Sequence, residues 1–315
     1  MESKKLTNGS LIRTCSIWRA LEVVGDAPIL LIIEAYWLGE RRFSGFKQRT
    51  GLLQALLSAR LNRLVDHEIF TKRPCGEDSK RYQYVMTEKG HDLFWVGLSM
   101  LHWERRWGQS EGKIKIRLDH RICNGHDIEP IPGCLQCCDP FDARQISWEP
   151  GPGAGWMEPH YSTRRRQRSP SKGAISDTTL LDTIIQVAGD RWSGLILRSI
   201  FTGYRRYHEI QEDVAIATNI LSERLAWLID IGILYTKAQA DAPSRHEYRL
   251  TESGIGYFSI LVMLLIWGDT WYKSPEGPPL RLFHGDDAHP LQPAMVCSHC
   301  QQPLKLGELD VVDTH

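Results

Sequence analysis

The sequence has no long hydrophobic run, no apolar leader and no excess of charge of either sign. Its 315 residues carry 38 basic and 38 acidic side chains. The polar N-terminal residues are not followed by the apolar stretch of a secretory signal. The most apolar segment, 257–267, is shorter than the roughly 20 residues that cross a bilayer, and its composition favours a buried helix. These absences predict a protein without a membrane span that resides in the cytoplasm.

Motifs of the common enzyme classes are also absent. The sequence has no glycine-rich phosphate loop, no nucleophile elbow and no pair of carboxylates at a catalytic spacing. We therefore expect no catalytic activity. Eight cysteines in a chain without a signal indicate metal binding, redox chemistry or simple burial rather than a disulfide framework.

An internal repeat dominates what is present. When the chain is shifted by 164 positions, two long segments, which we call copy 1 and copy 2, align without a gap. The matches include Gly25-Asp26 with Gly189-Asp190, Arg41-Arg42-Phe43 with Arg205-Arg206-Tyr207, Leu57-Ser58 with Leu221-Ser222, and Thr87-Glu88 with Thr251-Glu252. A tail with cysteine and histidine follows each copy. The chain is therefore a fused tandem of one unit.

The repeat predicts five segments. Copy 1 is expected at 11–110 and its tail, tail 1, at 111–148. Copy 2 is expected at 178–273 and its tail, tail 2, at 274–315. The segment between them, 149–177, is rich in Pro, Gly, Ser and Arg, which is typical of a flexible linker.

Hydrophobic periodicity predicts the structure of each copy. Copy 1 is expected to form helices at 16–24, 29–38, 43–50 and 53–67, then a hairpin of 69–73 with 81–86, and a last helix from 87. Asp26 is expected to cap the second helix. This order is that of a winged helix-turn-helix. The predicted fold class is mainly α with small β-hairpins (α+β), as two tandem winged helix-turn-helix domains, each with a Cys/His-containing tail.

A winged helix-turn-helix presents its recognition helix and its wing to DNA. Gln54 and Ser58 are expected at base edges, and the basic residues at backbone phosphates. The expected DNA contacts are Arg41, Arg42, Gln54, Ser58, Arg60, Arg63, Lys72, Arg73, Lys80 and Arg81 in copy 1, and Arg205, Arg206, Thr218, Asn219, Ser222 and Arg224 in copy 2. For Arg60, a tie to a neighbouring helix is the alternative, because it lies nearer the packed face.

Charge is divided unequally along the chain. Residues 1–118 carry 20 basic and 13 acidic side chains, or +7, and residues 119–315 carry 18 and 25, or −7. Because phosphate contacts supply most of the non-specific affinity for DNA, copy 1 is predicted to be the dominant DNA binder. In an intramolecular pseudo-dimer the two recognition helices would lie about 34 Å apart, one turn of DNA. A homodimer is the alternative assembly.

A further set of residues carries a resemblance to a known family: Cys15, Arg19-Ala20-Leu21, Gly25, Arg41-Arg42-Phe43, Phe46, Leu57-Ser58-Ala59-Arg60-Leu61, Tyr84 and Thr87-Glu88-Lys89-Gly90. Through these, each copy resembles the HxlR-type family of bacterial winged-helix transcription regulators, relatives of the MarR group. The resemblance implies a dimeric DNA-binding repressor or activator, located with the bacterial nucleoid. It departs at Pro28, where family members usually have Trp; copy 2 has Trp192 there. By similarity Cys15 is a candidate redox sensor, and an incidental thiol is the alternative.

The tails carry potential metal ligands. The predicted ligands are Cys123, His126, Cys134 and Cys137 in tail 1, and His284, His289, Cys297 and Cys300 in tail 2. Two thiolates on a C-x-x-C turn with two upstream ligands suit tetrahedral zinc. The sequence therefore predicts one zinc site within each tail. A redox dithiol and the absence of a special role are the alternatives.

These features together predict a sequence-specific DNA-binding transcriptional regulator in which copy 1 dominates. Control by a redox change or by a small-molecule effector is compatible with the sequence, and no effector is identified. The alternative is a protein-interaction module whose winged helices, at least the second, no longer bind DNA. The acidic copy 2 favours this alternative, and the basic wing of copy 1 opposes it.

Overall fold

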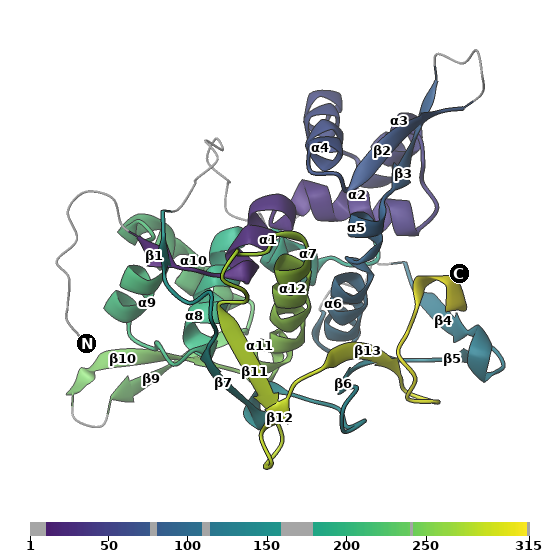
Figure 1. Cartoon of the computed structure of the whole chain (residues 1–315). Coiled ribbons are helices and arrows are strands. Elements are labelled where there is room, and N and C mark those ends of the chain that lie inside the picture. Colours follow the sequence, from purple (N-terminus) through teal and green to yellow (C-terminus); the bar gives the residue numbers. More distant parts are fainter. Residues whose placement is uncertain (1–10, 76–80, 109–113, 159–178, 240–241, 314–315) are drawn as a thin grey trace.

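The structure, a computed structural model, describes residues 11–75, 81–108, 114–158, 179–239 and 242–313 (Figure 1). Copy 1 has the predicted order of elements. They are α1 (Ser16–Val24), α2 (Ala27–Trp37), α3 (Phe43–Thr50), α4 (Gln54–Asp66), β2 (Phe70–Pro74), β3 (Tyr82–Met86), α5 (Glu88–His91) and α6 (Phe94–Trp107). Strands β2 and β3 pair antiparallel and form the wing.

Copy 2 repeats this order. Its elements are α7 (Thr183–Ala188), α8 (Arg191–Phe201), α9 (Tyr207–Val214), α10 (Thr218–Asp230), β9 (Leu234–Gln239), β10 (Ala242–Leu250), α11 (Glu252–Gly256) and α12 (Phe258–Trp271). The predicted fold class, two tandem winged helix-turn-helix units with small hairpins, is confirmed. The two wings, β2–β3 and β9–β10, point away from each other (Figure 1).

Local sequence explains the ends of the second helix in each copy. Pro28 lies in the first turn of α2, where its missing N–H leaves no helical hydrogen bond unmade. Gly39 and Gly203 follow α2 and α8 at the same repeat position, and both have φ of 101°. This left-handed conformation favours glycine and ends the helix in both copies.

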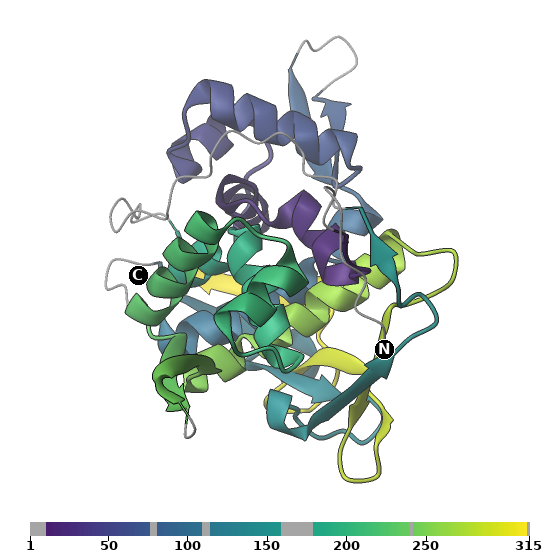
Figure 2. The same ribbon diagram turned by 90° about the vertical axis from the view of Figure 1, so that its left-hand side faces the viewer.

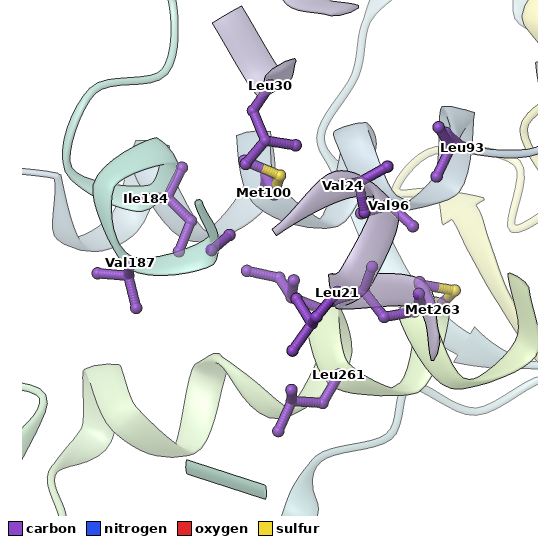
Figure 3. Close-up of a cluster of buried hydrophobic side chains, with 14 of the residues drawn as sticks. Leu21, Val24, Leu30, Leu93, Val96, Met100, Ile184, Val187, Leu261 and Met263 are labelled. Carbon is purple, nitrogen blue, oxygen red and sulfur yellow. The ribbon is translucent and has the colours of Figure 1, made fainter. Parts of the chain in front are cut away.

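The copies exchange their first helices. Helix α1 of copy 1 packs against α8 and α12 of copy 2, while α7 of copy 2 packs against α2 and α6 of copy 1. Figure 3 shows buried side chains from both copies in one cluster: Leu21, Val24, Val96, Met100, Ile184, Val187, Leu261 and Met263. The hydrophobic core is therefore shared, and each copy completes its own core with a helix of the other.

The apolar helix α12 lies at the centre of this core. By length and composition alone, the segment Glu252–Trp271 is compatible with a membrane span. However, most of α12 is buried, and it packs against α1, α6 and α8. Contacts inside the protein thus account for its apolar character, as predicted for 257–267.

An approximate two-fold axis relates the copies. Asp26 and Asp190 occupy the same repeat position and form an antiparallel β-bridge with each other. The Arg60 guanidinium lies 3.0 Å from the Asp26 carboxylate, and that of Arg224 lies 2.5 Å from Asp190. Neither aspartate side chain caps the helix that follows it, which corrects the expectation for Asp26. The carboxylates instead tie each recognition helix to the axis.

Tryptophan hydrogen bonds follow the same symmetry. Trp103 Nε1 on α6 donates to the carbonyl of Ser253 at 2.7 Å. Its repeat partner, Trp267 Nε1 on α12, donates to the carbonyl of Lys89 at 2.9 Å. Each indole therefore binds the start of the opposite copy's short helix, α11 or α5, and fixes α6 and α12 against both copies.

The tails interlock. Tail 1 contains β4 (Ile116–His120), η1 (Arg121–Cys123), β5 (His126–Asp127), β6 (Pro130–Cys134), η2 (Ala143–Gln145) and β7 (Ile146–Pro150). Tail 2 contains β11 (Leu280–His284), β12 (His289–Pro290), β13 (Pro293–Cys297), η3 (Leu306–Glu308) and β14 (Leu309–Asp313). Strand β6 pairs with β13, β4 with β14, and β7 with β11. The segments predicted as separate tails thus form joint sheets. In both views these strands lie below α4 (Figures 1 and 2).

Part of the predicted linker is ordered. Strand β7 reaches residue 150, and β8 (Trp156–Met157) pairs with β1 (Ile12–Arg13). The glycines between them permit close approach rather than flexibility: a Cβ on Gly151 would lie 2.2 Å from the carbonyl oxygen of Pro278. The prediction of a flexible linker is therefore wrong for 149–158. Residues 159–177 lie outside the described part of the chain.

Carboxylates of copy 1 hold the start of copy 2. Glu34 on α2 is 3% exposed and accepts the backbone N–H groups of Leu180 and Leu181 at 3.1 and 2.7 Å. Glu104 on α6 accepts two backbone N–H groups in the first turn of α7. Burial, opposed by the two hydrogen bonds, raises the pKa of Glu34 to about 7.

The pKa of Glu34 predicts a pH dependence of stability. Between about pH 4.5 and 7 the folded protein keeps a proton on Glu34 that the unfolded chain has released. Raising the pH through this window therefore lowers the free energy of unfolding. Glu34→Gln is expected to remove about 3 kcal/mol of this dependence. Urea unfolding from pH 4.5 to 8 measures it, and the same slope in both proteins would contradict the assignment.

The two arginine–aspartate pairs predict unequal losses of stability. The side chain of Arg224 is 3% exposed and that of Asp190 is 5% exposed, whereas that of Arg60 is 27% exposed. Removing one partner of a buried pair costs about 3–5 kcal/mol, because the other charge is left unpaired. Both aspartate side chains are buried, so the pairs differ in the arginine that an aspartate substitution leaves behind. We expect Asp190→Ala, which leaves the buried Arg224, to approach that loss and Asp26→Ala, which leaves the partly exposed Arg60, to cost clearly less. Denaturant unfolding compares them, and equal losses would refute the expectation.

Candidate DNA interface and metal clusters

The recognition helix of copy 1 separates a packed face from a polar face. Helix α4 buries Leu57, Leu61 and Leu64. Gln54 and Ser58 are exposed on the other side. Because apolar residues three and four apart share one face of a helix, the remaining positions face solvent. The residues predicted to read bases are therefore accessible.

The wing of copy 1 is basic and connected to α4. Lys72, Arg73 and Arg81 are exposed. Lys72 Nζ donates to Asn62 Oδ1 on α4 at 3.1 Å. This hydrogen bond joins the wing to the exposed side of the recognition helix. Lys80, also predicted to contact DNA, lies outside the described residues.

The two arginines before α3 differ in their surroundings. Arg41 Nη1 donates to the carbonyl oxygens of Tyr36 and Glu40, and its guanidinium lies 3.6 Å from the centre of the Tyr36 ring. It therefore stabilises the end of α2. Arg42 is exposed, and its predicted contact with phosphate is sterically open.

Three of the predicted DNA contacts bind other parts of the protein. Arg60 is paired with Asp26, as the alternative of a tie between helices expects. Arg63 donates to the carbonyl of Glu22, and burial lowers its pKa. Arg224 is 2% exposed, which corrects its assignment to DNA. On their helices these arginines lie beside the buried leucines rather than on the opposite, solvent-facing side, and they therefore contact the protein.

The recognition helix of copy 2 is exposed, but one of its predicted DNA contacts already has a partner within the protein. Thr218 and Asn219 are exposed at its start. Ser222 is also exposed, but its hydroxyl lies 2.9 Å from the hydroxyl of Tyr207. Copy 1 has Phe43 at the position of Tyr207, which offers no such partner.

Acidic side chains border the residues of copy 2 that are predicted to contact DNA. Glu223 is exposed on α10 where copy 1 has Ala59. Glu209 accepts the backbone N–H groups of Arg205 and Arg206 at 3.0 and 2.9 Å, and its carboxylate lies 3.9 Å from the Arg206 guanidinium. A carboxylate near the backbone of DNA repels phosphate and weakens its attraction to arginine.

The sequence argument does not name one exposed residue next to the predicted DNA contacts. Leu53, immediately before α4, is 78% exposed. An apolar side chain at the start of a recognition helix is suited to the methyl group of thymine. The available signal is the absence of a capping Ser, Thr, Asp or Asn at this helix start.

Four potential metal ligands meet in cluster I: His120, Cys123, Cys297 and Cys300. His120 Nδ1 lies 3.4 Å from Cys123 Sγ and 3.5 Å from Cys300 Sγ. The sulfurs of Cys123 and Cys297 are 3.8 Å apart. His120 Nε2, on the other side of the ring, lies 3.8 Å from the carboxylate of Glu308.

Cluster II contains Cys134, Cys137, His284 and His289. Cys134 Sγ lies 3.4 Å from His289 Nε2, and Cys137 Sγ lies 3.4 Å from His284 Nδ1. His289 Nδ1 is 2.7 Å from Asp287 Oδ1. In each cluster the ligand atoms all lie within 4.8 Å of one another.

The predicted grouping of ligands within each tail is wrong. Each cluster combines the C-x-x-C pair of one tail with two residues of the other. His126 belongs to neither cluster; its ring contacts that of His299 in a tilted arrangement, with centroids 4.5 Å apart. His120 takes a place that the spacing argument does not assign. The pairing of β6 with β13 explains the exchange, because each strand runs directly into a C-x-x-C turn.

The thiols in the clusters have displaced pKa values. Burial, together with the neighbouring Cys297 and Cys300, raises the pKa of Cys123 to about 11. Burial opposes ionisation of Cys134 too, but backbone N–H groups and His289 lower its pKa to about 6. A bound cation favours the thiolate in both environments.

Cys15, the candidate redox residue, is 7% exposed at the start of α1. It lines a cavity of about 120 Å³ together with Arg198, Thr202, Trp148 and Leu265. The cavity lies between α1, α8, α12 and the tail strands. The redox role stays a prediction from the resemblance.

Two winged helices with exposed recognition helices define a protein of the DNA-binding helix-turn-helix class. A family model of HxlR-like helix-turn-helix proteins matches residues 23–112 and 187–276, and the chain belongs to this family. Two uncharacterized HTH-type transcriptional regulators, from Mycobacterium bovis and Mycobacterium tuberculosis, are each 38% identical to it over 120 residues. The match covers 38% of this chain and 76% of each relative.

A further relative agrees with this class, and two solved structures are similar to parts of the chain. The HTH-type transcriptional regulator YodB of Bacillus subtilis is 29% identical over 90 residues, which cover 28% of this chain and 80% of YodB. The crystal structure of PA1607, a candidate transcription factor, shares 32% identity and a TM-score of 0.37, covering 40% of this chain and 91% of that chain. PA1374 of Pseudomonas aeruginosa shares 26% identity and a TM-score of 0.28, covering 50% and 96%. By family and relatives, the chain is a DNA-binding transcriptional regulator.

Proposed function

We propose that this regulator acts as a pseudo-dimer within one chain and reads one DNA site with both recognition helices. The antiparallel bridge between Asp26 and Asp190 carries the proposal, because it joins equivalent positions of the two copies. The exchange of α1 and α7 supports it, since each copy is completed by the other. Two helices related in this way fit half-sites about 34 Å apart.

Copy 1 supplies most of the affinity in this proposal. Its contacts are Arg42, Gln54, Ser58, Lys72, Arg73 and Arg81, with Leu53 added from the structure. Copy 2 contributes Arg205, Arg206, Thr218 and Asn219. The exposed Glu223, the partly buried Glu209 and the contact of the Ser222 hydroxyl with Tyr207 weaken DNA binding by copy 2. This role places the protein in the cytoplasm, on the chromosome, and assigns it no catalytic activity.

We also propose that both Cys/His clusters hold zinc. With Zn–S of about 2.3 Å and Zn–N of about 2.0 Å, tetrahedral geometry sets neighbouring sulfurs about 3.8 Å apart and sulfur and nitrogen about 3.5 Å apart. The observed separations are 3.8 Å between sulfurs and 3.4–3.5 Å between sulfur and nitrogen. Thiolate and imidazole are the ligands that structural zinc prefers.

Carboxylates behind the clusters support the same metal. Asp287 accepts the Nδ1 proton of His289, so that Nε2 faces the thiols. Glu308 lies behind Nε2 of His120, whose Nδ1 faces the thiols of cluster I. Such carboxylates orient histidine ligands at metal sites and raise their basicity.

A second candidate function concerns copy 2 alone. Glu223 is exposed in the middle of the face that would enter the major groove. A winged helix with an acidic recognition face is suited to contact a protein rather than DNA. In that case copy 1 alone would read the site.

Paired substitutions on the two recognition helices test the proposal. Gln54→Ala/Ser58→Ala is expected to weaken binding to a selected genomic fragment by about 10-fold or more, because each lost base contact costs about 1–3 kcal/mol. Thr218→Ala/Asn219→Ala is expected to give a smaller but measurable loss. Mobility-shift titration at fixed salt provides both values.

The matched control is Gln136→Ala/Gln302→Ala, two exposed amides of the tails, which is expected to bind as the unaltered protein does. Equal losses from the two recognition helices would refute the dominance of copy 1. No loss from the copy 2 variant would refute the two-helix reading and favour the protein-contact role for copy 2.

A further inference from the structure

Equivalent ligands of the two tails lie in different clusters, which the spacing of ligands along the sequence does not predict. His120 and His284 occupy equivalent positions, and the C-x-x-C pair of tail 1 is equivalent to that of tail 2. Each histidine nevertheless lies with the C-x-x-C pair of the opposite tail. The two-fold relation of the copies thus continues into the tails.

The fourth ligand differs between the clusters, and the structure gives the reason. Cys123 is a member of cluster I, whereas its repeat partner Asp287 binds His289 Nδ1 at 2.7 Å. His289 is a member of cluster II, whereas the ring of its repeat partner His126 contacts that of His299. Tail 2 therefore has no thiol at the repeat position of Cys123. His289, which Asp287 orients, supplies the fourth ligand of cluster II instead. Both clusters keep four donors despite the changed sequence.

Pairing between strands of the two tails brings ligands of both tails together, independently of the side chains. The equivalent strands β6 and β13 pair antiparallel, with Cys134 opposite Pro293 and Cys297 opposite Pro130. The strand that ends at His120, β4, pairs with β14 of tail 2, and the strand that ends at His284, β11, pairs with β7 of tail 1. Each cluster therefore lies where strands of both tails end.

We infer that two zinc ions cross-link the halves of the chain, each ion held by the C-x-x-C pair of one tail and two ligands of the other. This inference rests on the zinc proposal and is independent of DNA binding. Neither tail contains a complete site, so binding of either zinc ion requires both tails. The ions would hold copy 1 and copy 2 together, although the strands β4, β6, β11 and β13 that lead into the clusters lie away from α4 (Figure 1).

Counting tightly bound zinc in double variants of the full chain tests whether each ion is held by ligands of both tails. Two variants each remove two ligands of one cluster: Cys123→Ser/Cys297→Ser for cluster I and Cys134→Ser/His289→Ala for cluster II. Each is expected to retain one zinc after dialysis against a chelator, because the other cluster is intact. A third, Cys123→Ser/Cys134→Ser, damages both clusters and is expected to retain none.

Sites formed within each tail give the opposite counts. The first two variants would then damage both sites and retain none, and the third would retain one. Loss of both ions from the first two variants, whatever the third shows, overturns the inference. Native mass spectrometry of folded protein gives the counts, and because the first two variants affect different clusters, failure of one to fold leaves the other decisive.

The unaltered chain and one matched variant complete the test. The unaltered chain is expected to hold two zinc ions. Under half an equivalent, or a mass lowered by disulfide formation, would overturn the zinc proposal itself and with it the cross-link. His126→Ala, at the repeat position of His289, is expected to keep both ions; a loss of one would restore the grouping within tail 1.

Discussion

The structure depends on the contact between Asp26 and Asp190 at the centre of the approximate two-fold axis. Each aspartate joins the two copies through its backbone and holds an arginine of its own recognition helix through its carboxylate. One small contact thereby couples the relation between the copies to the placement of α4 and α10. The exchanged first helices, the reciprocal tryptophan bonds and the crossed tail strands repeat the same symmetry outward from this point.

Sequence patterns predict the local structure well, and contacts between copies poorly. The period of apolar residues finds α1 and α3 with the bounds observed, and the wing from its β-type runs. The spacing of Cys134 and Cys137 indicates a metal-binding turn, but nothing in spacing says which tail supplies the other ligands. From sequence alone, Arg224 is interpreted as a surface charge on a recognition helix. Its buried partner Asp190 is far away in the sequence and is identified only by the structure. The glycines of 149–158 suggest flexibility until the strand they approach is known.

Fusion of two copies into one chain permits them to diverge. In a homodimer of identical units, a change that weakens one recognition helix weakens both. Here copy 1 keeps its basic wing, while copy 2 gains Glu223 on its recognition helix and the hydroxyl of Tyr207 beside Ser222. The zero net charge of the chain therefore combines a basic half of +7 with an acidic remainder of −7. Divergence of the fourth ligand between clusters I and II follows the same logic, because each site had only to remain complete.

The central claim, a pseudo-dimer within one chain, is tested most directly by the stoichiometry and footprint of its complex with DNA. Native mass spectrometry of the complex with a selected fragment is expected to give one chain per site. Hydroxyl-radical footprinting of the same complex is expected to protect two regions one helical turn, about 34 Å, apart, the stronger one at copy 1. Two chains per site, or a single protected region, would contradict the account.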